Sequence, residues 1–347
     1  MGQVVVYVSC AASLEIASFR LDTAIGALIP LARTRVPGPV EPATMTLPIA
    51  LSADGGVLYA GVRTSPYPVS AFAVGAEGAL KLLGSGRLAA PPMHLAADPA
   101  GRALFAASYH GDRLMANRLD AAGVPGEPGC EIGGLPRAHC VLPEPEGRAF
   151  YAAILGQDRI LRQAIDPESG LMDTTPHEAA CCAAGAGVRM LVFGAEGRWI
   201  YGVNELDATV DAYARDPASG ALERRQTVPL GTPPAGADGK VPGWSADLHL
   251  TPDGRFLYAS ERRGNRLVGF AVASDGTLAP TGIMVEGEAN PWAFAIDPYG
   301  RWLICPGHDS GRVAVYAIDG RSGALTRVGA AEGGGNMAGV LAVKLAG

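Results

Sequence analysis

The sequence has 347 residues, which is long for one compact hydrophobic core unless the chain is built from repeats. Its 28 Lys and Arg against 34 Asp and Glu give a formal net charge of -6 with no basic run, which argues against a nucleic-acid partner. No stretch approaches the roughly 20 apolar residues of a membrane-spanning helix, and the N-terminal segment has no basic region ahead of an apolar one. We therefore expect no membrane partner and a cytoplasmic location.

One pattern recurs along the chain: a turn with Asp, Pro or Glu, then Gly, usually Arg, and a short apolar strand. It begins with "SADGGVLYAGVR" and ends with "DPYGRWLICPGH". The turn glycines are Gly55, Gly101, Gly147, Gly197, Gly254 and Gly300. After each comes an alternating strand and a second glycine turn, as in "NRLVGFAVASDGTL"; counting the N-terminal "LEIASFRLDTAIGAL", this second element occurs seven times.

A repeat of about 40 to 50 residues with period-2 strands and glycine turns is typical of a β-propeller. No segment shows a sustained helical period. The sequence therefore predicts an all-β, seven-bladed propeller with four-stranded antiparallel blades, formed as one domain by residues 1–347.

The two ends of the chain each hold part of a blade. The N-terminal copy begins with the strand "VVVYVSC", and an unassigned apolar strand, "MAGVLAVKLAG", remains at the C-terminus. We predict that these two strands pair and close the ring, which removes an open sheet edge. The longest repeat contains "PLGTPPAGADGKVPGW", residues 229–244, which we expect to form a loop on one face.

Equivalent positions of the repeats should converge on the axis of the ring. The residues eight places after each turn glycine are Arg63, Tyr109, Leu155, Glu205, Arg262 and His308. Those eight places before a glycine, which we expect at the start of the innermost strand, include His139, Arg189 and Trp292, and those seven before include His94 and Asp247. The sequence predicts that Arg63, Tyr109, Glu205, Arg262 and His308 line one mouth of the channel.

Arginine, carboxylate and imidazole groups together provide an acid/base site with clamps for an oxyanion. Taken singly, each polar residue could instead lie on a solvated rim of the channel. For the set, however, leaving unpaired charges buried near the channel would cost several kcal/mol. Asp247 and His249 are two residues apart, hence on one face of a strand. Their pairing could be a structural hydrogen bond or part of catalysis.

Several segments resemble a known family, the seven-bladed propeller lactonases, which includes bacterial cytoplasmic 6-phosphogluconolactonases and is related to carboxymuconate cyclase. The segments include "GAGVRMLVFGAEGRWIYGVNELDATVDAY", "WSADLHLTPDGRFLYASERR" and "ASYHGDRL". The resemblance implies catalytic roles for His139, Arg189, Glu205 and Arg262. It implies that Arg189 pairs with Glu205 of the same repeat and that Arg63, Tyr109, Trp244, Asp247 and His249 surround the site. The repeat positions add His94, Trp292 and His308 to the residues expected to bind the substrate. It implies no cofactor and no bound metal.

The chain departs from this family at two positions. Trp292 stands where the family usually has an arginine, and Met190 stands where it has a histidine. Because the arginine fork suits phosphate, the loss of one arginine weakens the case for a phosphorylated substrate. An aromatic side chain at position 292 could instead stack on a sugar ring.

The expected activity is acyl transfer at the carbonyl of a sugar lactone. Arg189 and Arg262 would polarise the carbonyl, while Glu205 or His139 would take the proton of the attacking oxygen. With water the product is an aldonic acid, and the enzyme is a lactone hydrolase. With another hydroxyl of the sugar the enzyme would interconvert δ- and γ-lactones. A non-catalytic binding platform is the second alternative. The oligomeric state stays open, with a monomer as one possibility.

Overall fold

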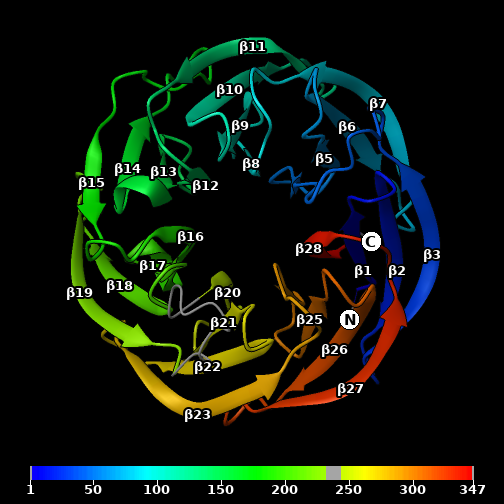
Figure 1. Ribbon diagram of the computed structural model, residues 1–347, viewed down its shortest axis with the longest axis vertical. Helices are drawn as coiled ribbons and strands as arrows, with labels where there is room; N and C mark the ends of the chain where they lie inside the picture. The colour runs from blue at the N-terminus through cyan, green and yellow to red at the C-terminus, as the bar shows by residue number, and fades with distance from the viewer. Residues whose placement is uncertain (1, 232–243, 346–347) are drawn as a thin grey trace.

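The computed structural model describes residues 2–231 and 244–345, which form a ring of seven four-stranded antiparallel sheets around a central axis (Figure 1). The predicted all-β seven-bladed propeller is confirmed. Within these ranges the only helical segments are two short 3-10 turns, η1 (Leu155–Gln157) and η2 (Ala195–Gly197), and no helix is long and apolar enough to cross a membrane. The loop predicted over 229–244 falls mostly on residues 232–243, which lie outside the described residues.

Each blade runs from an innermost strand at the axis to an outermost strand at the perimeter. The innermost strands are β28 (Met337–Lys344), β4 (Ile49–Leu51), β8 (His94–Ala97), β12 (Ala138–Pro143), β16 (Val188–Phe193), β20 (Ser245–Leu250) and β24 (Ala295–Ile296). The second strands are β1 (Val4–Cys10), β5 (Val57–Gly61), β9 (Ala103–Ser108), β13 (Ala149–Ile154), β17 (Trp199–Asn204), β21 (Phe256–Glu261) and β25 (Trp302–Pro306). The third strands are β2 (Glu15–Asp22), β6 (Pro68–Val74), β10 (Arg113–Leu119), β14 (Arg159–Ala164), β18 (Thr209–Arg215), β22 (Arg266–Val272) and β26 (Arg312–Ile318). The outermost strands are β3 (Ala27–Arg35), β7 (Leu80–Arg87), β11 (Pro125–Ile132), β15 (Glu178–Cys181), β19 (Leu222–Pro229), β23 (Leu278–Glu286) and β27 (Leu325–Glu332).

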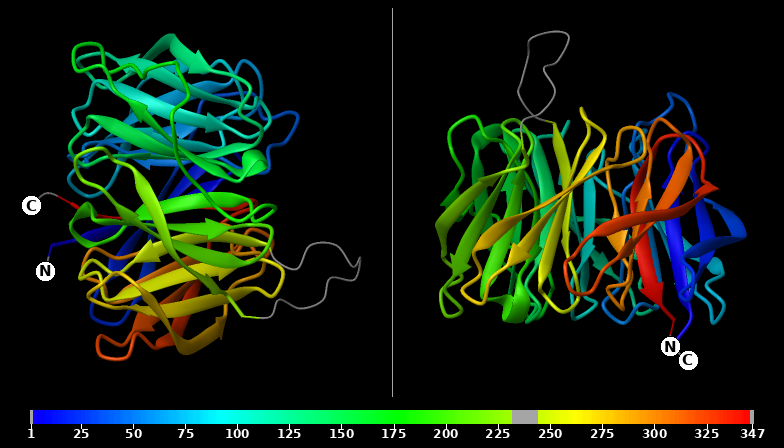
Figure 2. Two further views of the ribbon diagram at one scale, coloured as in Figure 1. Left: turned by 90° about the vertical axis from the view of Figure 1, so that its left-hand side faces the viewer. Right: turned by 90° about the horizontal axis from the view of Figure 1, so that it is seen from below.

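The ring closes through the two ends of the chain, as predicted. β1 pairs with β28 in antiparallel register, from Val4 opposite Lys344 to Val8 opposite Val340. Figures 1 and 2 show these blue and red strands side by side. Because the C-terminal strand completes the blade that the N-terminal strands begin, no sheet edge is left open between the first and last blades.

The hydrophobic core of the described residues is divided into seven clusters, one between each pair of neighbouring blades. Strand β1 shows the arrangement: Val4, Val6 and Val8 pack toward the last blade. Val5 and Tyr7 pack toward the second blade. A strand buried on both faces needs apolar side chains at successive positions, which explains continuous runs such as "VVVYV".

Buried tyrosines of the second strands connect four of the seven blades to the next one. In each case the hydroxyl donates to the carbonyl of the glycine in the hairpin between the third and outermost strands of the following blade. The pairs are Tyr7 with Gly78 (2.9 Å), Tyr151 with Gly220 (2.6 Å), Tyr201 with Gly276 (2.9 Å) and Tyr258 with Gly323 (2.6 Å). The bond satisfies a buried hydroxyl and explains why tyrosine recurs in this strand of the repeat.

The hairpin glycine of this contact has no room for a side chain. Gly276 has a φ of +78°, and a Cβ there would overlap the Trp199 ring of the preceding blade. Gly282 has a similar φ of +75° but nothing within 4 Å of the corresponding point.

We expect Gly276→Ala to lower the free energy of unfolding by about 3 kcal/mol or more, and Gly282→Ala by only about 1–2 kcal/mol of backbone strain. Urea unfolding of both variants checks this, and equal losses would contradict it.

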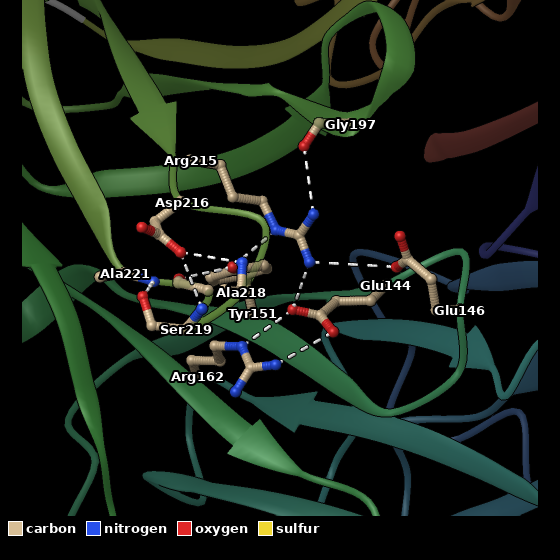
Figure 3. A network of polar contacts seen from close by, with 11 residues as sticks. Glu144, Glu146, Tyr151, Arg162, Gly197, Arg215, Asp216, Ala218, Ser219 and Ala221 are labelled. Carbon is tan, nitrogen blue, oxygen red and sulfur yellow. Dashed lines mark hydrogen bonds and ion pairs between the residues drawn. The ribbon is translucent and has the colours of Figure 1, made fainter.

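A buried ion-pair network joins the third and fourth sequence repeats (Figure 3). The Glu144 carboxylate, which is fully buried, accepts hydrogen bonds from Nε and Nη2 of Arg162 at 2.8 and 3.1 Å. Arg215, from β18 of the neighbouring blade, lies 2.9 Å from the same carboxylate and donates from Nε to the Tyr151 hydroxyl at 3.0 Å. The Glu144 carboxylate therefore contacts two guanidinium groups that come from two blades, and the half-exposed carboxylate of Glu146 lies 3.9 Å from Arg215 as well (Figure 3).

Candidate active site

An axial cavity of about 150 Å³ is lined by residues of several innermost strands. Six residues predicted from the repeat positions or from the resemblance form part of its wall: His94, His139, Arg189, Asp247, His249 and Trp292. The cavity thus collects side chains from β8, β12, β16 and β20 and from the segment before β24.

β-Bulges place His139 and Arg189 in this wall. In β12 the pairing with β13 skips from Ala138 to Cys140, and in β16 the pairing with β17 skips from Val188 to Met190. The residue in each gap, His139 or Arg189, is the extra one. A bulge changes the direction of its side chain and is common beside active sites. The pairing of β20 breaks in the same way, between Ser245 and Leu248, so Asp247 also lies in a bulge.

Trp292 differs from the sequence prediction, which placed it at the start of an innermost strand. The strand β24 begins only at Ala295 and is two residues long. Trp292 therefore lies in the segment that leads into the blade. That segment is irregular because "NPW" contains Pro291, which cannot donate a ladder hydrogen bond.

Glu205 lies between two arginines. It follows β17, and its Oε2 is 2.8 Å from Nε of Arg189 in the same blade and 3.1 Å from Nη2 of Arg262 in the next blade. The side chains are 12%, 5% and 2% exposed, respectively. The sequence analysis predicted the contact of Glu205 with Arg189 but not the contact with Arg262. The Arg189 contact is an ion pair whose N–H does not point at the carboxylate, so this N–H has no acceptor among the described residues.

Arg262 contacts two aromatic rings and two backbone carbonyl groups. Its guanidinium stacks against the rings of Trp244 and Trp292, at 4.3 and 4.7 Å from the ring centroids. Its Nε donates to the Trp244 carbonyl at 3.2 Å, and its Nη2 to that of Ser245 at 3.3 Å. Burial and the neighbouring Arg189 lower the pKa of Arg262 to about 9, against the opposing effect of Glu205. The group remains a cation at neutral pH.

The five residues predicted to line the channel mouth lie beside the cavity wall rather than in it. Each follows the end of a second strand by one or two residues; they are Arg63, Tyr109, Glu205, Arg262 and His308. Besides the contacts of Glu205 with Arg189 and of Arg262 with Trp292, three more connect them to the wall: Tyr109 stands edge-on to His139 (6.1 Å between centroids), His308 stacks on Trp292 (5.0 Å), and Arg63 donates to the Thr46 hydroxyl (2.9 Å). That these five residues line one mouth of the channel stays a prediction.

Four buried side-chain nitrogens around this cavity have no hydrogen-bond partner within the described part of the chain. They are Nε of Arg63, Nδ1 of His139, Nε of Arg189 and Nε1 of Trp292. Buried polar groups are almost always paired, because an unpaired one loses its hydration without compensation. These four nitrogens are themselves buried, so they show how polar the surroundings of the cavity are and not which groups a ligand would contact.

Two imidazoles of the wall are neutral. Burial, followed by the charge of Arg189, holds the pKa of His139 well below the usual value. Burial lowers the pKa of His94 to about 4, and the Val141 amide donates to its Nδ1 at 3.4 Å. Within residues 2–231 and 244–345, no three His, Cys, Asp or Glu side chains are arranged to hold a metal ion.

Three further residues line the wall that were not predicted as site residues: Thr46, Met93 and Met190. Met93 stands eight places before Gly101, the position that supplies His139 and Arg189 in other repeats, so the repeat did carry the signal. Thr46 lies in the proline-rich connection between β3 and β4, where no repeat position distinguishes it.

The fold and this cavity define a propeller with an enclosed polar site on its axis. Residues 4–341 match the family model described as "Lactonase, 7-bladed beta-propeller". The chain belongs to this family.

Its relatives share the whole propeller. The chain is 37% identical over 325 residues to a 6-phosphogluconolactonase of Serratia proteamaculans and 36% identical over 323 residues to one of Pectobacterium carotovorum, covering 93% of each chain in both comparisons. The structure of a periplasmic gluconolactonase from Pseudomonas aeruginosa superposes with a TM-score of 0.85 at 25% identity and covers 99% of both chains.

Proposed function

We propose that this protein hydrolyses a sugar δ-lactone to the aldonic acid in its axial cavity. The observation that carries the proposal is the wall of the cavity, which brings together His139, Arg189 and the Asp247–His249 pair, because a lactone carbonyl and sugar hydroxyls supply the complementary groups. The names of the relatives point to the same reaction class. The substrate is a small molecule, the reaction needs no cofactor, and we place the protein in the cytoplasm.

The proposed roles divide between the wall and the residues beside it. Arg189 lies in the wall, and its charge stabilises the oxyanion that forms on the carbonyl oxygen. Glu205 accepts the proton of the attacking water, and His139 is the alternative acceptor. The Nε and Nη2 atoms of Arg262 are bound to carbonyl groups, so it acts mainly by holding Glu205 in place and adding positive charge.

Product analysis tests this function against its two alternatives. The enzyme is added to glucono-δ-lactone and to its 6-phosphate, and NMR follows the δ-lactone, the γ-lactone and the open acid. Accelerated formation of the acid supports hydrolysis. Formation of the γ-lactone first would identify an isomerase. Saturable binding without turnover would identify a binding platform.

We expect the 6-phosphate to improve the substrate only modestly. Trp292 occupies the position of a family arginine, and its ring packs against Arg262 and His308. Arg63 remains as a cation near the cavity, so a phosphate is tolerated. The ratio of kcat/KM for the phosphorylated and plain lactones should stay below about 100, which corresponds to about 2.7 kcal/mol. A larger ratio in steady-state kinetics would show that phosphate recognition survives without the arginine.

A further inference from the structure

The cavity wall contains one His–Asp pair whose function the roles above leave open. On β20, Nε2 of His249 lies 3.1 Å from Oδ2 of Asp247. The Asp247 carboxylate is buried and also accepts the backbone N–H groups of Leu248 (3.0 Å) and Phe294 (3.1 Å). The Phe294 ring meets the imidazole edge-on, 4.9 Å between centroids. Asp247 and Phe294 together fix the position and tilt of the imidazole.

The pairing determines which nitrogen of His249 is left for another partner. A carboxylate only accepts hydrogen bonds, so Nε2 carries the proton that is donated to Asp247. The other nitrogen, Nδ1, has no hydrogen-bond partner within the described part of the chain. The side chain lines the cavity and is 39% exposed, whereas that of Asp247 is 7% exposed. His249 thus presents a titratable nitrogen to the cavity from a fixed position.

We propose that His249, oriented by Asp247, is the general acid that protonates the ring oxygen of the lactone. This inference rests on the proposed hydrolysis. Water forms a bond to the carbonyl carbon and loses its proton to Glu205. The tetrahedral intermediate then collapses, the bond between that carbon and the ring oxygen breaks, and Nδ1–H of His249 moves to the ring oxygen. The products are a carboxylic acid and a hydroxyl group; Glu205 releases its proton to solvent, and solvent returns one proton to Nδ1.

The charges around the cavity favour His249 over the other imidazoles for this step. Burial opposes protonation of His249, but the charge of Asp247 and their hydrogen bond outweigh it and raise its pKa. The other ionisable groups of the wall are His94 on β8, His139 on β12 and Arg189 on β16. The two histidines have lowered pKa values and stay neutral. The arginine already has the role of stabilising the oxyanion.

The test is His249→Gln, because the glutamine amide can still donate to Asp247 but has no titratable nitrogen. The matched control is His177→Gln. His177 also lies 3.1 Å from an aspartate, Asp173, but that pair is exposed and outside the cavity wall. We expect His249→Gln to lower kcat on glucono-δ-lactone about 100-fold, with KM within about threefold, and the control to match the wild type.

A second substrate separates acid catalysis from a structural role. In the ring-sulfur analogue of the lactone the leaving group is a thiolate, which needs little protonation, so His249→Gln should slow its opening by less than about threefold. After subtraction of spontaneous hydrolysis, the wild-type rate on the oxygen lactone should fall as pH rises through the raised pKa of His249. That limb should be absent in His249→Gln and should move to lower pH in Asp247→Asn.

Equal losses on the oxygen and sulfur lactones, or a high-pH limb that persists in His249→Gln, would overturn the inference and leave His249 a structural residue. In that case the wild-type enzyme still opens the lactone, and the proposed function stands. A wild-type protein that opens neither lactone would instead refute the proposed function, and the inference with it.

Discussion

Glu205→Gln should lower kcat/KM for the lactone by about 100-fold or more, the usual contribution of a general base. Glutamine keeps the shape of the side chain but cannot accept the proton of the attacking water. It also leaves Arg189 and Arg262 without the carboxylate between them, although both guanidinium groups are almost fully buried. Steady-state kinetics measures the loss, and urea unfolding shows how much of the change is due to stability.

Glu196→Gln is the matched control for this result. Glu196 lies in the same blade and forms an ion pair with Arg198 at 3.0 Å, but both side chains are more than 70% exposed. Its substitution should leave kinetics and stability unchanged. Glu205→Asp keeps the negative charge but shortens the side chain, and we expect an intermediate loss. If a folded Glu205→Gln enzyme turned over the lactone at the normal rate, Glu205 would be a structural partner of the arginines and His139 the remaining base.

Glu144→Gln should be the most destabilising of these substitutions, by about 3–5 kcal/mol of unfolding free energy. The Arg215 side chain is 3% exposed, and it would lose the carboxylate that balances its charge across the blade interface (Figure 3). Arg162 would lose the same partner within its own blade. Urea unfolding measures the effect, and the activity of the folded fraction should be unchanged.

Glu127→Gln is the control for position 144. Glu127 also pairs with an arginine of a neighbouring blade, Arg87, but the two side chains are 73% and 59% exposed. An exposed ion pair contributes about 0–1 kcal/mol, so the variant should unfold like the wild type. Similar losses at positions 127 and 144 would show that burial of the network does not decide its effect.

The contribution of Glu144 should also depend on pH. Burial alone would raise the pKa of Glu144, but hydrogen bonds and charge from Arg162 and Arg215 outweigh it, so its folded-state pKa is lowered. A depressed pKa means that the stabilisation is complete above the unfolded-state value and is lost as pH falls through the folded-state value. Glu144→Gln should therefore be less sensitive to acid unfolding than the wild type.

The repeat by itself predicted the architecture of this protein. Turn glycines and strands recur along the sequence, and each repeat has the same local physics of glycine turns and strands buried on both faces. The incomplete units at the two ends predicted the pairing of β1 with β28. The ion pair of Arg189 with Glu205 was also within reach, because both residues belong to one repeat and flank the same turn glycine, Gly197.

Only the tertiary structure decided how the site is assembled. The second partner of Glu205, Arg262, comes from another blade, and its distance depends on how the two sheets pack. The bulges that direct His139 and Arg189 into the cavity arise from the register between paired strands. The sequence shows where each residue lies within its repeat, because local periodicity encodes that position. Distance from the axis and contact across a blade boundary depend on seven sheets packing into one closed ring, which no single repeat specifies.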